Sequence, residues 1–501
     1  MEGIAQLFSW AIPNTNEVTN MKTGERICRV FLGIIVAAVT LGACRKTPEV
    51  QAVIAKNDGK FEEALQVVDE TPPDEILPET VSLSREFDST DESVHFTVAI
   101  NEALRMGSMP VVEVAPHFLT SEDAKNVAFA LFGEKTFYEA EPEMHPQYSK
   151  DEIRRKIERW SNGVVSGSVT DKFIQEYSLF MEEAPEENPH KLCDWQLKSE
   201  WYYFYGENAE NTASDPGNDM ICASVYVNNV PYRIRITTRN RSDFVINNIA
   251  VFPYDGASPA GIDESIFRDM LCDDVKPDEE RINEIKKRAM EMLSKMNLGD
   301  WEIDNCTIKN EGSSIKPRYS ITITAVPVFD GNAALRTAQL SSLKGTSEYA
   351  SNYYYSDVEF QFSTNGNLLS FNMKSPVDVI SVINPSVKIL GFNDLIQIAE
   401  NQLKLTDAYA YDILGAGEVD REIRCQVNIE DVSYGLIRVK KKNTENLYYY
   451  IPAMQFFGNS ELYNSNGELM ADTDSIWGEK AILLELNAID GSIVRIGYSQ
   501  T

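Results

Sequence analysis

Residues 277–309 read PDEERINEIKKRAMEMLSKMNLGDWEIDNCTIK, and they join a helix to a strand within one short stretch. Pro277 suits the first turn of a helix and Gly299 suits its end. Apolar residues recur at helical spacing along one face: Ile282, Ile285, Ala289, Met292, Leu293 and Met296. A strand-forming segment follows at 301–309. The stretch therefore predicts a helix over 277–296 that covers a sheet starting at 301.

The flanking sequence repeats this plan of a helix followed by strands. Upstream, helices are predicted at 121–132, 150–160 and 170–181, and strands at 195–205, 220–227, 232–238 and 244–253. Downstream, strands are predicted at 318–329, 353–363 and 368–374. A last helix at 393–403 precedes strands at 421–429, 434–441, 447–457, 481–486 and 493–498. Asn228-Asn229, Asn365-Gly366 and Asp490-Gly491 predict tight hairpins. The predicted fold class is α+β, with repeated modules of a helix packed on an antiparallel meander sheet.

Changes in composition divide the 501 residues into six segments. We expect a mis-called start at 1–20, a lipoprotein signal peptide at 21–43, a disordered, acidic and Pro-rich tether at 44–93, and α+β modules at 94–260, 261–380 and 381–501. The tether contains ETPPDEILPE, and such segments cannot bury enough apolar surface to fold. A short helix over 59–68 fits inside it.

The segment 21–43 has the three parts of a secretory leader. It starts with the positive residues Lys22, Arg26 and Arg29, and continues as the apolar run FLGIIVAAVTL at 31–41. That run is shorter than the ~20 residues of a transmembrane helix. Small residues follow it, as at a signal-peptide cleavage site. Met21 is therefore the expected true start.

Cysteine at the end of this leader predicts lipid attachment. Leu41, Gly42, Ala43 and Cys44 form a lipobox, and Cys44 becomes the lipidated first residue of the mature chain. Two or more acyl chains give stable anchoring, at ~0.8 kcal/mol per buried CH₂. The expected location is the outer face of the cytoplasmic membrane, with the rest of the protein extracytoplasmic.

The formal net charge of −31 restricts the partners of the chain. A strongly acidic surface repels nucleic acid and anionic lipid heads. We therefore predict no nucleic-acid binding, and membrane contact through the lipid on Cys44.

The chain is rich in Tyr, Phe, Thr, Ile and Val, which favour β-strands.

Motifs with recognisable chemistry are sparse. The four histidines form no H-E-x-x-H. His145 near Glu141 is better explained as a solvated loop than as a metal site, and His190 near Cys193 lacks an orienting group for nucleophilic catalysis. Asp472 and Asp474 lack the other ligands of a calcium loop. We predict no catalytic residue, no metal, no cofactor and no enzymatic activity.

The cysteines left after the leader contain no C-x-x-C. Free thiols are the default expectation. A bridge between Cys272 and Cys306 is the alternative.

Aromatic clusters supply the candidate binding residues, which are Trp201, Tyr203, Tyr354 and Tyr449. Alternate residues of a strand face opposite ways, so one side of such a cluster can build the core while the other contacts a peptide or glycan. The competing explanation is cross-strand packing within the sheet.

The last module resembles a PepSY-type module through LYYYIPAMQFFG at 447–458 and LLELNAIDGSIVRIG at 483–497. The lipobox, the tether and the helix–meander repeats together resemble the large uncharacterised surface lipoproteins of Gram-positive anaerobes. That resemblance implies a surface location and partner binding, and assigns no site residue beyond Cys44.

Three functional hypotheses follow. The first is a non-catalytic, lipid-anchored surface protein that binds a partner protein, peptide or glycan. The second is an envelope regulator of a membrane sensor or peptidase, as the PepSY resemblance implies. The third is a hydrolase with an unrecognised carboxylate site.

Overall fold

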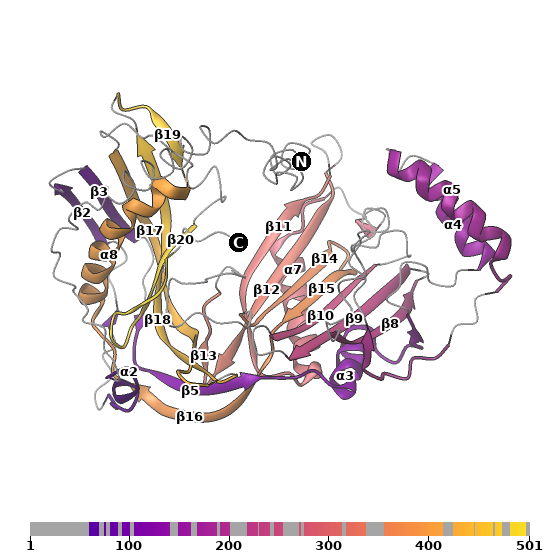
Figure 1. Cartoon of the computed structure of the whole chain (residues 1–501), viewed down its shortest axis with the longest axis horizontal. Helices are drawn as coiled ribbons and strands as arrows, with labels where there is room; N and C mark the ends of the chain where they lie inside the picture. The colour runs from indigo at the N-terminus through magenta and orange to yellow at the C-terminus, as the bar shows by residue number, and fades with distance from the viewer. Residues whose placement is uncertain are drawn as a thin grey trace, which may run out of the picture. The chain divides into compact units, whose positions relative to one another are not determined.

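The computed structural model describes residues 60–69, 75–76, 81–88, 93–100, 105–140, 149–161, 168–187, 191–200, 218–228, 230–240, 245–253, 270–271, 275–312, 317–336, 355–413, 424–444, 446–463, 466–472 and 481–496. Two large sheets hold most of the described strands (Figure 1). Within these residues, no helix is both long and apolar enough to span a membrane. The predicted α+β class is confirmed.

The ten-stranded sheet has the order β11-β12-β14-β15-β10-β9-β8-β6, with β13 beside β12 and β7 beside β8. Its N-terminal strands are β6 (Tyr138–Glu139), β7 (Lys198–Glu200), β8 (Asn218–Val227), β9 (Val230–Asn240) and β10 (Val245–Pro253). Its C-terminal strands are β11 (Trp301–Asn310), β12 (Tyr319–Phe329), β13 (Asn332–Ala333), β14 (Asp357–Ser363) and β15 (Leu368–Lys374). All of these pairs are antiparallel.

This sheet contains the repeated plan twice. Helix α3 (Ser121–Phe132) precedes the first meander and α7 (Glu279–Met296) precedes the second, and the two helices pack together. The last strands of the two meanders, β10 and β15, pair at the centre, with Asn248 opposite Lys374. The first half also carries an inserted helix pair, α4 (Lys150–Ser161) and α5 (Ser168–Glu183).

Local chemistry explains where these helices begin. Thr120, rather than Ser121, caps α3, because its hydroxyl accepts the N–H of Asp123 and the Asp123 carboxylate accepts the N–H of Thr120. Ser149 and Glu152 form a capping box at the start of α4. Asp278 caps α7.

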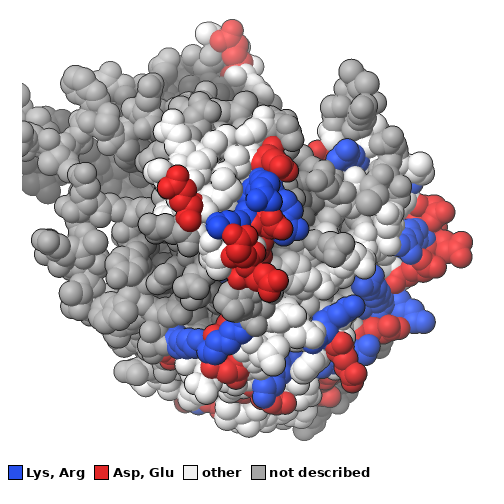
Figure 2. Space-filling view, turned by 90° about the vertical axis from the view of Figure 1, so that its right-hand side faces the viewer, with Lys and Arg blue, Asp and Glu red and all other residues white. Residues whose placement is uncertain are grey.

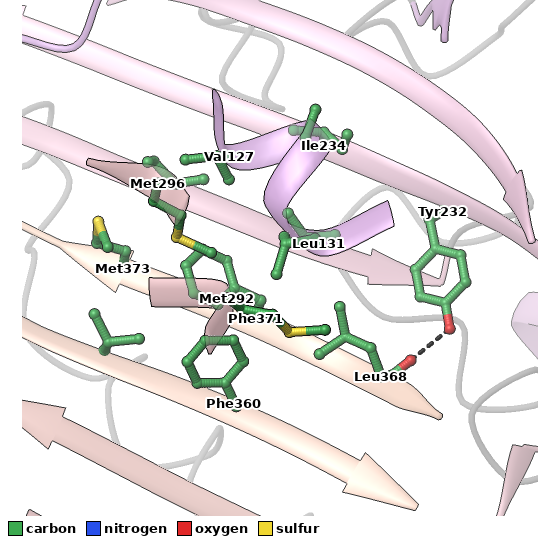
Figure 3. Packing of buried hydrophobic residues seen from close by; sticks show 14 of the residues in the cluster. Val127, Leu131, Tyr232, Ile234, Met292, Met296, Phe360, Leu368, Phe371 and Met373 are labelled. Atoms are coloured by element: carbon green, nitrogen blue, oxygen red, sulfur yellow. Dashed lines mark hydrogen bonds between the residues drawn. The ribbon is translucent and has the colours of Figure 1, made fainter. Parts of the chain in front are cut away.

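The core of the ten-stranded sheet lies where α3 and α7 meet its strands (Figure 3). Leu131 of α3 and Met292 of α7 belong to the same cluster as Phe360 and Phe371, whose ring centroids lie 4.8 Å apart. The buried Tyr232 hydroxyl donates to the carbonyl oxygen of Leu368. The predicted apolar faces of both helices therefore build one shared core.

The nine-stranded sheet has the order β16-β5-β18-β17-β3-β2, with β19 and β20 beside β18 and β21 beside β20. Its strands are β2 (Val81–Asp88), β3 (Ser93–Ile100), β5 (Met109–Pro116), β16 (Val377–Val387), β17 (Arg424–Lys440), β18 (Tyr448–Tyr463), β19 (Leu469–Asp472), β20 (Ala481–Asn487) and β21 (Ile493–Ile496). Only the β3–β17 pair is parallel among the described pairs of this sheet. β17 is continuous where two strands were predicted, because a bulge after Ile429 carries the pairing through the expected gap.

One helix of this part, α8 (Phe392–Ile413), lies where the sequence predicted a helix and buries one apolar face. Leu395, Ile396, Ala399 and Leu403 lie in the core of the nine-stranded sheet.

Parts of the predicted tether are folded, which corrects that boundary. Helix α2 (Lys60–Ala64) lies within the short helix expected at 59–68, and Phe61 and Leu65 are buried in the same core as α8. Strand β2 pairs with β3 over its whole length. A two-residue pair joins β1 (Glu75–Ile76) to β4 (Arg105–Met106). The composition missed these elements because the apolar residues are spread among acidic ones.

The predicted module boundaries at 260 and 380 do not separate sheets. Strands of the first two modules share the ten-stranded sheet, and β5 of the first module joins the nine-stranded one. The chain connects the two sheets through β5, which leads into α3, and through β16, which follows β15 after two residues. These two connecting strands pair with each other as one antiparallel ribbon. Cross-sheet pairing depends on residues far apart in sequence, which local patterns do not reveal.

Candidate binding edge

Strand β16 forms one edge of the nine-stranded sheet, and its two halves differ. On one side the strand pairs with β5 throughout. On the other side its C-terminal half is covered by the chain itself: Val68 bridges Val387, the N–H of Asp69 donates to the carbonyl oxygen of Ser386 at 2.8 Å, and Asn384 donates to Leu65 at 2.9 Å. Within the described ranges no strand covers residues 377–383. We call these residues the free half-edge.

Large aliphatic side chains are exposed along the free half-edge. The exposed fractions are 56% for Val379, 55% for Ile380 and 51% for Val382. Neighbours in a regular strand point to opposite faces. The register shifts between Val379 and Ser381, which makes Ile380 the extra residue of a bulge. The bulge explains how two consecutive aliphatic side chains are both exposed.

The edge strand β11 of the other sheet is a useful contrast. It pairs with β12 on one side, and its exposed positions include Glu302, Asp304 and Lys309. Charged side chains are a common protection of a sheet edge against unwanted pairing. The free half-edge has Asp378 as its single charged residue. Its aliphatic surface is therefore typical of a site that accepts a partner.

A buried ion pair supports the ribbon beneath the free half-edge. Glu113 of β5 is 8% exposed, accepts a 2.5 Å contact from the Lys441 ammonium, and also accepts the Ser381 hydroxyl at 3.3 Å. The hydrogen bond that Lys441 donates to Glu113 raises the pKa of Lys441. Lys441 also lies 5.2 Å from the ring centre of Tyr449. These contacts fix β16 against β5 and β18.

His117 holds the other end of the ribbon. It follows β5, its Nδ1 lies 2.8 Å from Asp378 of β16, and its Nε2 lies 3.2 Å from Asp123 of α3. The hydrogen bond to Asp123 is the main cause that raises the pKa of His117 to about 9, with Asp378 adding to it against the opposing effect of burial. The imidazolium therefore ties the free half-edge to the first turn of α3 at neutral pH.

This arrangement predicts a pH-dependent stability. Because the folded-state pKa of His117 lies above its ordinary value of 6.5, the cluster stabilises the fold fully below pH 6.5 and loses that contribution as pH rises through 9. We expect the free-energy difference between wild type and His117→Gln to shrink by roughly 1–3 kcal/mol between about pH 6 and pH 10. Urea unfolding of both proteins at the two pH values measures it. An equal difference at both would contradict the role of the imidazolium.

The structure places one of the four predicted binding aromatics. Tyr449 is 6% exposed in the core of the nine-stranded sheet, so the expectation of an open binding position there is corrected. Tyr448 and Tyr450 are buried as well, because β18 is central in its sheet and both its faces are covered. Trp201, Tyr203 and Tyr354 lie outside the described residues, as do Leu41, Gly42, Ala43 and Cys44.

The remaining chemical candidates are described only in part. Cys306 is a free thiol, so the alternative of a Cys272–Cys306 bridge is wrong. Cys306 lies within β11, paired opposite Ile323 of β12. His145, His190 and Asp474 lie outside the described residues. In the part of the chain that is described, no group of three His, Cys, Asp or Glu residues could hold a metal ion.

Sequence reasoning missed β16, which is VDVISVINPSV. Its many β-branched residues are a strand signal, but Pro385 and the lack of strict alternation weaken it. The described residues on the face in Figure 2 carry Lys and Arg beside Asp and Glu. Charge alone therefore singles out no docking site on that face, and the free half-edge, unpaired among the described residues, is the more specific feature.

Comparison with known proteins leaves the family open. No family model matches the chain, and no curated protein sequence is similar to it. Among solved structures, the chain is similar to an uncharacterized protein from Eubacterium rectale, with 13% identity and a TM-score of 0.34 over 87% of this chain and 99% of that one. That likeness carries no argument about function, so the PepSY-like resemblance stays a prediction.

Proposed function

We propose that this chain is a lipid-anchored, non-catalytic extracytoplasmic protein that binds a partner protein along the free half-edge. The observation that supports this proposal most is the exposure of Val379, Ile380 and Val382 on the half of an edge strand whose outer side is unpaired in the described residues. Natural proteins usually cover such edges or line them with several charges, so an edge with exposed aliphatic side chains indicates an interaction surface.

A protein partner fits this surface better than a glycan. The free half-edge offers backbone N–H and C=O groups in strand spacing together with aliphatic side chains, which is the recognition chemistry of strand addition. Of the four aromatic residues expected to contact a peptide or glycan, Tyr449 is the one within the described residues, and it is buried. The proposal therefore narrows the partner, peptide or glycan of the sequence-based hypothesis to a polypeptide.

Crosslinking tests the proposal directly. We expect a photoreactive amino acid at Val382 of the full-length, membrane-anchored chain to give a discrete adduct with another polypeptide, detected by immunoblot and mass spectrometry. Val275, which is 73% exposed away from any strand, is the matched control position. Adduct formation at both positions alike, or at neither, would contradict a binding surface on β16.

Anchoring is tested by Cys44→Ala. Without the thiol no diacylglyceryl group can be attached, and the acyl chains are the whole of the proposed membrane affinity. We expect the variant to move from the membrane fraction to the soluble or precursor fraction, measured by fractionation and incorporation of a labelled fatty acid. Cys28→Ala, within the leader, is the matched control and should leave labelling unchanged. Labelled, membrane-bound Cys44→Ala protein would contradict the lipobox.

A further inference from the structure

We propose that the polypeptide bound at the free half-edge is an extended segment, alternately aliphatic and basic, that adds as an antiparallel strand to residues 377–383. This inference rests on the proposed function and specifies its partner. It follows from how the other half of β16 is covered, from the side chains of the free half-edge, and from the charge of the chain.

The C-terminal half of β16 already shows this mode of binding within the chain. Residues 67–69 lie along it in an extended path, antiparallel to β16, with Val68 opposite Val387. The N–H of Asp69 donates to Ser386 and the N–H of Lys388 donates to Val67, at 2.8 and 3.1 Å. The outer backbone groups of β16 therefore pair readily with an added strand, as a sheet edge does.

The sequence that follows residues 67–69 is poorly suited to pairing with a strand. The residues after Asp69 are Glu70, Thr71, Pro72 and Pro73. Proline has no N–H to donate, so the two prolines cannot extend a ladder of hydrogen bonds toward residue 383. A strand of a partner that runs in the same direction as residues 67–69 would continue their row of backbone hydrogen bonds along β16.

Side chains of the free half-edge define the apolar part of the partner. Val379, Ile380 and Val382 are each about half exposed, and their burial needs aliphatic side chains from the added strand. The bulge at Ile380 and the register shift after Val382 bend the edge. A bent edge disfavours pairing with arbitrary strands, so a matching strand has a defined register.

Charge defines the rest of the partner. The Asp378 side chain is 56% exposed beside the half-edge, and the chain carries a formal net charge of −31. Lys or Arg next to the aliphatic positions would share Asp378 with His117 and be steered by the acidic protein. A second copy of this chain would bring an equal acidic charge, so self-pairing through β16 is disfavoured.

Synthetic peptides test this proposal on the full-length chain in detergent micelles. The probe is a peptide of about nine residues that alternates Val and Lys, a length typical of a strand. One control replaces each Lys with Glu, and a second methylates the backbone nitrogens along one edge of the Val–Lys peptide. Fluorescence anisotropy measures the affinity, and hydrogen exchange measures protection of the amides at 377–383.

We expect the Val–Lys peptide to bind and protect these amides, and both controls to bind at least about tenfold more weakly. Val382→Lys should weaken binding of the Val–Lys peptide by a similar factor, while Val275→Lys should not.

If the Glu peptide binds as tightly as the Val–Lys peptide, the proposed basic character of the partner is overturned. If the methylated peptide binds as tightly, strand addition is overturned. Concentration-dependent dimers whose 377–383 amides are protected without peptide would overturn a foreign segment in favour of a second copy. A Val382 crosslink to a partner that the Val–Lys peptide does not displace would overturn this inference and leave the proposed function standing.

Discussion

Replacing Gly458 with alanine should be among the most destabilising single changes in this protein. Gly458 of β18 lies opposite Ile429 of β17, next to the bulge that precedes Asp431. A Cβ at position 458 would lie 1.8 Å from the carbonyl oxygen of Asn428 and 2.9 Å from its carbonyl carbon. Both are backbone atoms of the neighbouring strand, so no side-chain rotation can relieve the clash.

The longest strand pair of the nine-stranded sheet must then separate or lose its bulge. We expect Gly458→Ala to lower the free energy of unfolding by more than about 3 kcal/mol, above the usual cost of overpacking. Urea unfolding followed by circular dichroism measures the change. Gly107→Ala is the matched control, because no atom lies within 4 Å of its added Cβ. Similar midpoints for the two variants would contradict the close approach of β17 and β18.

Replacing Arg438 with alanine should cost a comparable amount, about 3–5 kcal/mol. Arg438 of β17 is fully buried. Its guanidinium carbon lies 5.1 Å from the ring centre of Tyr448 and 5.3 Å from that of Tyr355, and Nη1 lies 3.5 Å from the Ser356 hydroxyl. Tyr355 and Ser356 directly precede β14 of the other sheet, and Tyr450 also donates to Ser356 at 3.3 Å.

Arg438 therefore joins the two sheets through contacts that a smaller side chain cannot make. Arg438→Lys should recover only part of the loss, because a compact ammonium does not stack as a planar guanidinium does. Thermal unfolding compares these variants with Lys309→Ala, an exposed position on β11. The near-ultraviolet signal of tyrosine should change in the Arg438 variants alone. An alanine variant with the wild-type midpoint would show that the guanidinium does not stabilise the contact.

Much of the secondary structure could be predicted from local patterns. The apolar face of α7 follows the 3.6-residue period, so Ala289 was correctly expected to be buried. The turn at Asn365-Gly366 needs a left-handed residue, and Gly366 has φ of +80°. The hairpin between β14 and β15 follows from it.

Local patterns could not predict the site. The segment VDVISVINPSV contains five β-branched aliphatic residues before its proline, yet the exposure of Val379 and Val382 depends on which strands lie beside β16. The lipobox, by contrast, is a continuous motif, and the chemistry expected at Cys44 needs no tertiary contact.

The sequence by itself determined the helices, the hairpins and the predicted leader, because periodicity, capping residues and turn residues act over a few neighbouring positions. Only the tertiary structure decided that β10 pairs with β15, that Arg438 is buried against Tyr448, and that half of β16 remains unpaired among the described residues. Each of these depends on contacts between residues far apart in the chain. The free energy of such contacts comes from burial and pairing in three dimensions, which no single stretch of sequence encodes.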